Sequence, residues 1–176
     1  MDEATNKRLG ELIFELANGN VEALSEIYVI MAKLLYAIGN IYYEQKADVE
    51  DAVQNLLLLI CYKSKKFKAN TNACAWIIKT FQNSIKNHLR RRKRENDFIE
   101  NKVEVIKSQS VRDDIYLDNH LFINDMFKRL TSYERDLIIY RYWSKCSIGE
   151  IARILFKPKS TIESQLKNLE NKIKNL

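Results

Sequence analysis

The stretch SIGEIARILFKPKSTIESQLKNLENKIKNL, residues 147–176, holds the one proline of the 176-residue chain between two apolar runs. Apolar residues in each run recur three and four positions apart, as they do along one face of a helix. Proline has a fixed φ and no amide hydrogen, so Pro158 is predicted to end the first helix and to be tolerated in the opening turn of the second. The residues expected to face inward are Ile148, Ile151, Ala152 and Leu155, then Ile162, Leu166, Leu169, Ile173 and Leu176.

Helix starts around this stretch carry the capping-box pattern, a Ser or Thr followed three residues later by Glu. The pattern occurs at Thr131, at Ser147 and again at Ser160. A short helix, a short turn and a second helix with a polar outer face predict a helix-turn-helix, whose second helix can enter a DNA major groove. An ordinary helical hairpin in a small core is the alternative that these two helices leave open.

The composition of the whole chain also favours helices. Only four glycines accompany the single proline, and 46% of the residues are hydrophobic. We therefore expect an all-α protein with one moderate core or two small ones. The apolar run LLLLIC at 56–61 is shorter than the roughly 20 residues that span a bilayer, and MDEATNKRLG lacks the apolar core of a signal peptide. The expectation is a cytoplasmic protein with no membrane insertion.

The sequence lacks the residue patterns of an enzyme or a metal protein. Cys61, Cys74 and Cys146 lie far apart without CxxC spacing, so buried free thiols are expected rather than a disulfide framework or a zinc site. No glycine-rich phosphate loop, HExxH or GxSxG motif is present, and His88 and His120 are isolated from each other. The prediction is a protein without catalytic activity, cofactor or metal.

Charge is distributed in blocks of alternating sign. The net charge is −6 over residues 1–51, +11 over 52–94, −4 over 95–136 and +5 over 137–176. Residues 52–94 contain no Asp or Glu at all. Two separate basic surfaces indicate a protein that contacts a polyanion at two places.

Helical spacing of apolar residues continues through the first half of the chain, over about 7–18, 20–43, 48–67 and 73–94. Residues 95–114 are polar and poor in large apolar side chains, so they are predicted to be a linker. A further helix is expected at about 115–129. The chain is thus predicted to form two small helical domains, residues 1–94 and 115–176, joined by that linker.

The predicted helix at 73–94 has two different faces. Ile78, Phe81, Ile85 and Leu89 form an apolar face, whereas Lys79, Gln82, Asn83, Lys86 and Arg90 lie beside them on a polar one. Such a helix can pack on one side and offer cations and amides on the other. Phosphate contacts along it, with amides and aromatic rings near FKANTNACAW at 67–76, would suit a single strand with unstacked bases. The alternative is that the arginines are only solvated and that Trp76 belongs to the core.

The segment LTSYERDLIIYRYWSKCSIGEIARILFKPKSTIESQL, residues 130–166, resembles the promoter-recognising C-terminal domain of bacterial RNA polymerase sigma factors of the sigma-70 family. Phe156 departs from the family pattern, which usually has glycine in the turn, and Glu163 and Gln165 stand where basic residues are common. The matching positions are Leu130-Thr131, Glu134-Arg135, Arg141-Tyr142, Glu150-Ile151-Ala152, Ile154-Leu155 and Thr161-Ile162.

Two segments of the first half resemble the same family. DVEDAVQNLLLLI, residues 48–60, is similar to the acidic helix by which sigma factors hold the polymerase. AWIIKTFQNSIKNHLRRRKR, residues 75–94, is similar to the helix that engages the minus-ten promoter element. Phe81, Gln82 and Asn87 depart from the family pattern. The matching positions in this second segment are Trp76, Asn83, Leu89, Arg90, Arg91 and Arg94.

The resemblance implies a sigma factor of the extracytoplasmic-function group or a close relative, with core RNA polymerase and promoter DNA as partners and an anti-sigma factor as a further candidate. A helix-turn-helix regulator that acts without polymerase is the alternative, but it would have no need for an acidic partner-facing helix at 48–54. Core polymerase binding is expected of Asp48, Glu50, Asp51 and Gln54. Minus-ten DNA binding is expected of Asn70, Asn72, Lys79, Asn83, Lys86, Arg90, Arg91 and Arg94. Minus-thirty-five DNA binding is expected of Lys157, Lys159, Ser160, Thr161, Ser164, Gln165 and Lys167.

Overall fold

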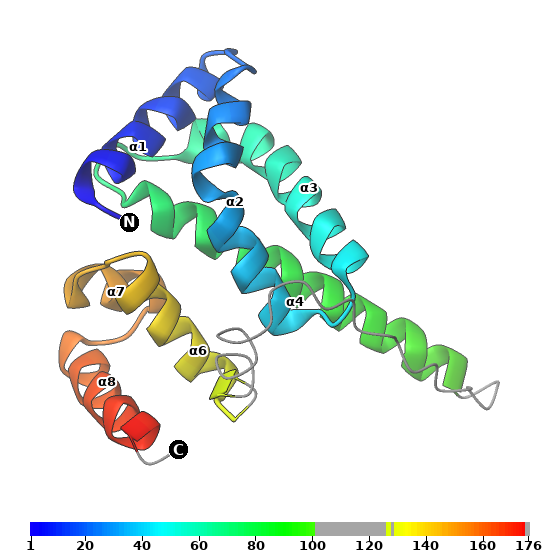
Figure 1. Cartoon of the computed structure of the whole chain (residues 1–176), viewed down its shortest axis with the longest axis vertical. Helices are drawn as coiled ribbons and strands as arrows, with labels where there is room; N and C mark the ends of the chain where they lie inside the picture. Colours follow the sequence, from blue (N-terminus) through cyan, green and yellow to red (C-terminus); the bar gives the residue numbers. More distant parts are fainter. Residues whose placement is uncertain (101–125, 128, 175–176) are drawn as a thin grey trace.

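A computed structural model describes residues 1–100, 126–127 and 129–174, without the side chains of 96–100, and this part of the chain is helical with no strands. Four helices form an N-terminal bundle: α1 (Glu3–Ala17), α2 (Ala23–Tyr42), α3 (Lys46–Lys63) and α4 (Ala73–Glu100) (Figure 1). A short 3-10 turn, η1 (Ser64–Lys66), follows α3. The predicted all-α fold is confirmed, and each of the four predicted helical stretches contains a helix.

The core of the N-terminal bundle comes from the apolar stripe of each helix. Leu9 of α1, Ile27 and Met31 of α2, Leu56 of α3 and Phe81 of α4 are all fully buried. The α2 and α3 helices approach closely at Gly39, where an added Cβ atom would lie 2.5 Å from Cγ1 of Val49. The α3 and α4 helices also pack side by side in this bundle. The acidic start of α3 and the basic helix α4 therefore form neighbouring surfaces.

The α2 helix is long and apolar enough to span a membrane by length and composition alone. Its unbroken apolar runs are short, so the sequence analysis did not predict it as a membrane span. In the bundle, α2 packs against α1 and α3, and Leu35 and Ile38 on its inner face are fully buried. Packing in the helical core therefore accounts for the apolar residues of this inner face.

The C-terminal bundle consists of α6 (Ser132–Ile138), one π-helical turn η2 (Ile139–Trp143), α7 (Ile148–Leu155) and α8 (Lys159–Lys174) (Figure 1). Ile151, Ile162 and Leu166 are buried, as expected from the apolar spacing. Leu176 lies outside the described residues.

Two of the three predicted capping boxes are present. The Thr131 side chain accepts a hydrogen bond from the Glu134 amide while Glu134 bonds back to Thr131, and Ser147 and Glu150 form the same arrangement. The prediction at Ser160 is wrong, because α8 begins at Lys159 and Ser160 already lies inside the helix. Since proline fixes its own φ, the helix can start directly after Pro158 without a Ser N-cap.

The turn between α7 and α8 also differs from the prediction. The α7 helix ends at Leu155, three residues before Pro158, because Phe156 adopts a left-handed conformation with φ 54° and ψ 46°. The Phe156 amide and the Lys157 amide both donate to the Ala152 carbonyl oxygen, which closes the helix end. Phe156 rather than Pro158 therefore terminates α7.

The structure describes only the first residues of the predicted linker, 95–100. The α4 helix continues to Glu100, six residues past the predicted end of the first domain at residue 94. Residues 101–114 of the predicted linker, and nearly all of the predicted helix at 115–129, lie outside the described residues. The division of the chain into two domains remains a prediction.

Candidate nucleic-acid interface

The residues of α3 that are predicted to bind polymerase differ in exposure and in whether they form an ion pair. Asp51 and Gln54 are exposed, whereas the Asp48 carboxylate lies 3.2 Å from Arg92 of α4 and Glu50 lies 3.7 Å from Lys46. Ion pairs of this kind on a surface contribute little stability. Among the four residues predicted to bind a partner, Asp51 and Gln54 are thus the ones that form no ion pair with another described residue.

The basic residues predicted on α4 fall into two groups along the helix. Arg90, Arg91 and Arg94 are exposed on its C-terminal part, which projects away from the bundle (Figure 1), and Asn83 is exposed two helical turns before Arg90. This part can contact an extended polyanion directly.

The second group lies against the C-terminal bundle. Lys86 donates to Asp136 of α6 at 2.7 Å, and Lys79 donates to the Ile154 carbonyl oxygen of α7 at 3.0 Å. Burial lowers the pKa of Lys79 below its ordinary value. Between these two lysines lies Gln82, which is only 2% exposed. The polar face predicted for α4 is therefore split between solvent and a contact with the other bundle.

Asp136 is the centre of that contact and was not singled out from the sequence. Its carboxylate accepts hydrogen bonds from Lys86 and from the Gln82 amide, the latter at 3.0 Å, and the residue is 8% exposed. Burial raises the pKa of Asp136, and the hydrogen bond from Lys86 offsets this only in part. Tyr140 completes the network by donating to the Gln82 carbonyl oxygen at 2.7 Å.

The two asparagines predicted near the start of α4 have different surroundings. Asn70 is exposed, whereas the Asn72 side chain accepts a hydrogen bond from the Ala75 amide at 2.9 Å. Asn72 thereby satisfies one of the free amides at the start of α4. Burial tends to raise the pKa of Glu150 of α7, but hydrogen bonds from Ser147, and the Asn72 side chain after them, lower it.

The predicted minus-thirty-five residues lie on and just before α8. Thr161 and Gln165 are half-buried, and the Gln165 carbonyl oxygen accepts a hydrogen bond from the Tyr133 hydroxyl. This bond uses one of the two lone pairs of the Gln165 carbonyl oxygen. The remaining five predicted residues, Lys157, Lys159, Ser160, Ser164 and Lys167, are exposed.

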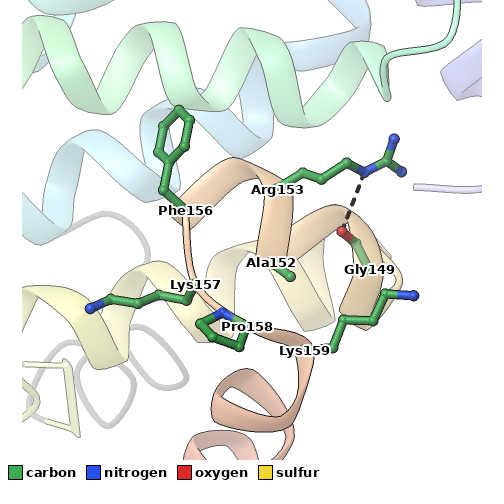
Figure 2. A pocket seen from close by; sticks show the side chains of 7 residues that line it. All are labelled: Gly149, Ala152, Arg153, Phe156, Lys157, Pro158 and Lys159. Atoms are coloured by element: carbon green, nitrogen blue, oxygen red, sulfur yellow. Dashed lines mark hydrogen bonds between the residues drawn. The ribbon is translucent and has the colours of Figure 1, made fainter.

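A surface hollow of about 850 Å³ lies at the turn between α7 and α8. Figure 2 shows three cationic side chains around it, Arg153, Lys157 and Lys159, together with the ring of Phe156. Lys157 and Lys159 were predicted, but Arg153 and Phe156 were missed. The excess of cations in residues 137–176 was the sequence signal that could have pointed to Arg153.

Residues 27–95, which include most of α2, all of α3 and most of α4, match the protein family Sigma-70 region 2. The chain contains a sigma-70 region 2 domain. The resemblance to the sigma-70 family is thereby confirmed, and both the acidic residues of α3 and the arginines of α4 lie within region 2. No curated protein sequence matches the chain.

Two solved structures are similar in fold. One is CnrH in complex with the cytosolic domain of CnrY, with 16% identity, a TM-score of 0.67 and coverage of 97% of this chain and 96% of that chain. The other is the sigma factor RpoE in complex with the anti-sigma factor NepR from Bartonella quintana, with 23% identity, a TM-score of 0.66 and coverage of 86% of this chain and 94% of that chain. The likeness extends beyond region 2 to the C-terminal bundle.

Proposed function

We propose that this protein is a sigma factor of the extracytoplasmic-function group or a close relative, which acts in the cytoplasm without catalysing a reaction. It binds core RNA polymerase, directs it to promoters and assists melting of the DNA. The observation that carries the proposal is the region 2 match, because it covers the acidic helix and the basic helix that lie side by side.

In this proposal each surface has one task. The α3 surface with Asp51 and Gln54 binds core polymerase, α4 captures the non-template strand of the minus-ten element, and α8 reads the minus-thirty-five element in the major groove. An anti-sigma factor is a further proposed partner, since RpoE was solved in complex with one. A helix-turn-helix regulator without polymerase is less well supported, because it gives the region 2 segment no role.

Copurification with core polymerase tests the proposal. The wild-type chain should retain core enzyme and, added to it, should start transcription on a genomic library at specific sites. A double variant, Asp51→Lys with Gln54→Trp, should lose core binding because both side chains are exposed and central to the proposed surface. Glu22→Lys is a suitable control, since it reverses an exposed charge outside α3.

The result separates the two candidate functions. Loss of core binding in the folded double variant, with retention in the control, supports the sigma factor. A wild-type chain that binds duplex DNA but never core polymerase would instead support the regulator.

A further inference from the structure

The start of α6 holds one side of α8 through two neighbouring residues. The Tyr133 hydroxyl donates to Oε1 of Gln165, and the Glu134 carboxylate accepts from the Lys172 ammonium at 2.8 Å. Gln165 and Lys172 are about two helical turns apart and therefore lie on the same side of α8. Of these two α8 residues, Gln165 is the one predicted to contact DNA.

Tyr133 occupies a fixed place at the start of α6. Thr131 and Glu134, on either side of it in the chain, bond to each other in both directions as a capping box. The Tyr133 ring is half-buried and packs against the core. Burial raises the pKa of its phenol, and the nearby Asp136 raises it further. The hydroxyl therefore keeps its proton at neutral pH and remains a hydrogen-bond donor.

Gln165 lies at the edge of the buried face of α8. Ile162, three residues before it, and Leu169, four residues after it, are both buried, whereas Gln165 itself is half-buried. Its amide can thus bond to α6 on one side and still reach a ligand outside the protein.

The bond from Tyr133 leaves most of the Gln165 amide available. It uses one lone pair of Oε1 and leaves the second lone pair and both hydrogens of Nε2 unaffected. A glutamine that reads adenine in the major groove accepts a hydrogen bond from N6 and donates one to N7. The groups needed for this contact are therefore compatible with the bond from Tyr133.

We propose that Tyr133 is a positioning residue for promoter recognition: it holds the Gln165 amide in one orientation and thereby sets its preference for adenine. Tyr133 acts through Gln165 rather than by touching a base. The inference rests on the proposed function, because it needs α8 to read the minus-thirty-five element.

A fixed orientation matters because the two ends of an amide offer opposite hydrogen bonds. A half-turn about the last side-chain bond exchanges the oxygen with the NH2 group and turns the match with adenine into a mismatch. A glutamine that is free to rotate must also lose rotamer freedom when it binds, which lowers affinity by roughly two- to tenfold. The bond from Tyr133 orders the amide before DNA arrives.

Side-chain NMR of the full chain tests the hydrogen bond without DNA or polymerase. Tyr133→Phe removes the hydroxyl and keeps the ring. The NH2 signals of Gln165 can be identified by their loss in Gln165→Ala. In Tyr133→Phe they should shift and report a more mobile amide. Unchanged signals would overturn the proposal, because the hydroxyl would then not hold the amide.

Binding selection with core RNA polymerase and the full chain, on duplexes with a randomised minus-thirty-five element, tests the effect on reading. Gln165→Ala identifies the base pair that Gln165 contacts. At that base pair, Tyr133→Phe should lower the preference for adenine by roughly two- to tenfold relative to the wild type. Affinity for non-preferred sequences should stay the same, because phosphate contacts do not depend on this amide. A folded Tyr133→Phe variant with the parental preference would overturn the proposal.

Tyr142→Phe is a matched control. The Tyr142 hydroxyl donates to Glu170 of α8 at 2.6 Å, so this variant removes the same group from the same helix without touching Gln165. It should keep the wild-type base preference. An equal loss at the same base pair in Tyr142→Phe would overturn the proposal, since the loss would then come from a loosened α8.

A double variant, Tyr133→Phe with Gln165→Ala, tests whether Tyr133 acts through Gln165. It should have the base preference of Gln165→Ala alone, because no amide remains to be positioned. A further loss in the double variant would count against the proposal. A wild-type chain that binds core polymerase but shows no base preference would overturn base reading by α8, and with it the role of Tyr133. Copurification with core polymerase reports separately on the rest of the proposed function.

Discussion

The Lys79 ammonium lies 4.8 Å from the centroid of the Phe156 ring, so α4 of region 2 contacts the turn between α7 and α8 directly. Phe156 is 85% exposed and holds a left-handed backbone conformation that favours glycine. A large aromatic residue in this position costs backbone strain, and its ring covers a cation of the other bundle.

Two replacements of Phe156 should separate the strain of its left-handed backbone from the contribution of its ring to stability. Phe156→Gly and Phe156→Ala both remove the ring, but only Gly removes the left-handed strain. We expect Phe156→Gly to be the more stable of the two by about 1 kcal/mol. Urea denaturation of both variants measures the difference. Equal stability would show that the turn relaxes to another conformation without the ring.

Two tyrosines near Asp136, buried Tyr140 and half-buried Tyr42, should respond differently to loss of the hydroxyl. Tyr140→Phe leaves the Gln82 carbonyl oxygen without its donor and should cost about 1 to 2 kcal/mol. The buried Tyr42 hydroxyl lies near the same groups but makes no hydrogen bond of good geometry within the described residues, so Tyr42→Phe should change stability by less than about 0.5 kcal/mol. Measurement of the unfolding free energies of Tyr140→Phe and Tyr42→Phe tests this difference. A large cost for Tyr42→Phe would mean that one of these neighbours or a bridging water binds that hydroxyl.

The capping boxes predict a loss of stability in acid. Burial tends to raise the pKa of Glu134, but hydrogen bonds from Lys172 and Thr131 outweigh this effect and lower the pKa. Hydrogen bonds from Ser147 lower the pKa of Glu150 against burial in the same way. Because both pKa values in the folded state lie below the ordinary value of 4.5, these carboxylates stabilise the fold above pH 4.5, and this stability is lost as the pH falls through their folded pKa values.

Glu134→Gln and Glu150→Gln keep a capping side chain but remove the titration. The unfolding free energy of the double variant should therefore fall less steeply between neutral pH and about pH 3 than that of the wild type. Circular dichroism during urea titration at several pH values measures this slope. An identical slope would place the acid sensitivity at other carboxylates.

The arginines of the projecting part of α4 should determine the salt dependence of DNA binding. Mutation of Arg90, Arg91 or Arg94 to Ala should remove one phosphate contact and reduce the log-log salt slope by roughly 0.7 to 0.9. Arg92→Ala is a control from the same run, because Arg92 is already paired with Asp48 and should change the slope less. Fluorescence anisotropy across a salt series measures the slopes. If all four variants keep the parental slope, these arginines are only solvated.

The exposed side of α8 should divide into base-reading and phosphate-binding residues. Gln165→Ala should alter preference at one or two base pairs, with a cost of about 1 to 3 kcal/mol if the contact is bidentate, whereas Lys159→Ala should weaken all sequences similarly. Binding selection on randomised upstream elements distinguishes the two. A folded Gln165→Ala variant with the parental preference at every position would exclude this face from promoter reading.

Local signals in the sequence were sufficient to predict the helices and several of their ends. Apolar spacing predicted α1 to α4, α7 and α8, and the patterns at Thr131 and Ser147 predicted real capping boxes, because each depends on residues three or four positions apart. The end of α7 was predicted less well. Pro158 is the stronger local signal, but the left-handed conformation of Phe156 comes first along the chain.

The use of the polar face of α4 depended on residues far apart in the chain. The same spacing places Lys79, Gln82, Lys86 and Arg90 on one face, yet Gln82 is buried and Arg90 is exposed. The difference arises from Asp136, which is 54 positions from Gln82 and meets it only when the two bundles pack together. The sequence by itself thus determined which residues share a helix face. Only the tertiary structure decided which of them face water and which face oxygen atoms of the other bundle, since burial and partner choice depend on the packing of distant segments.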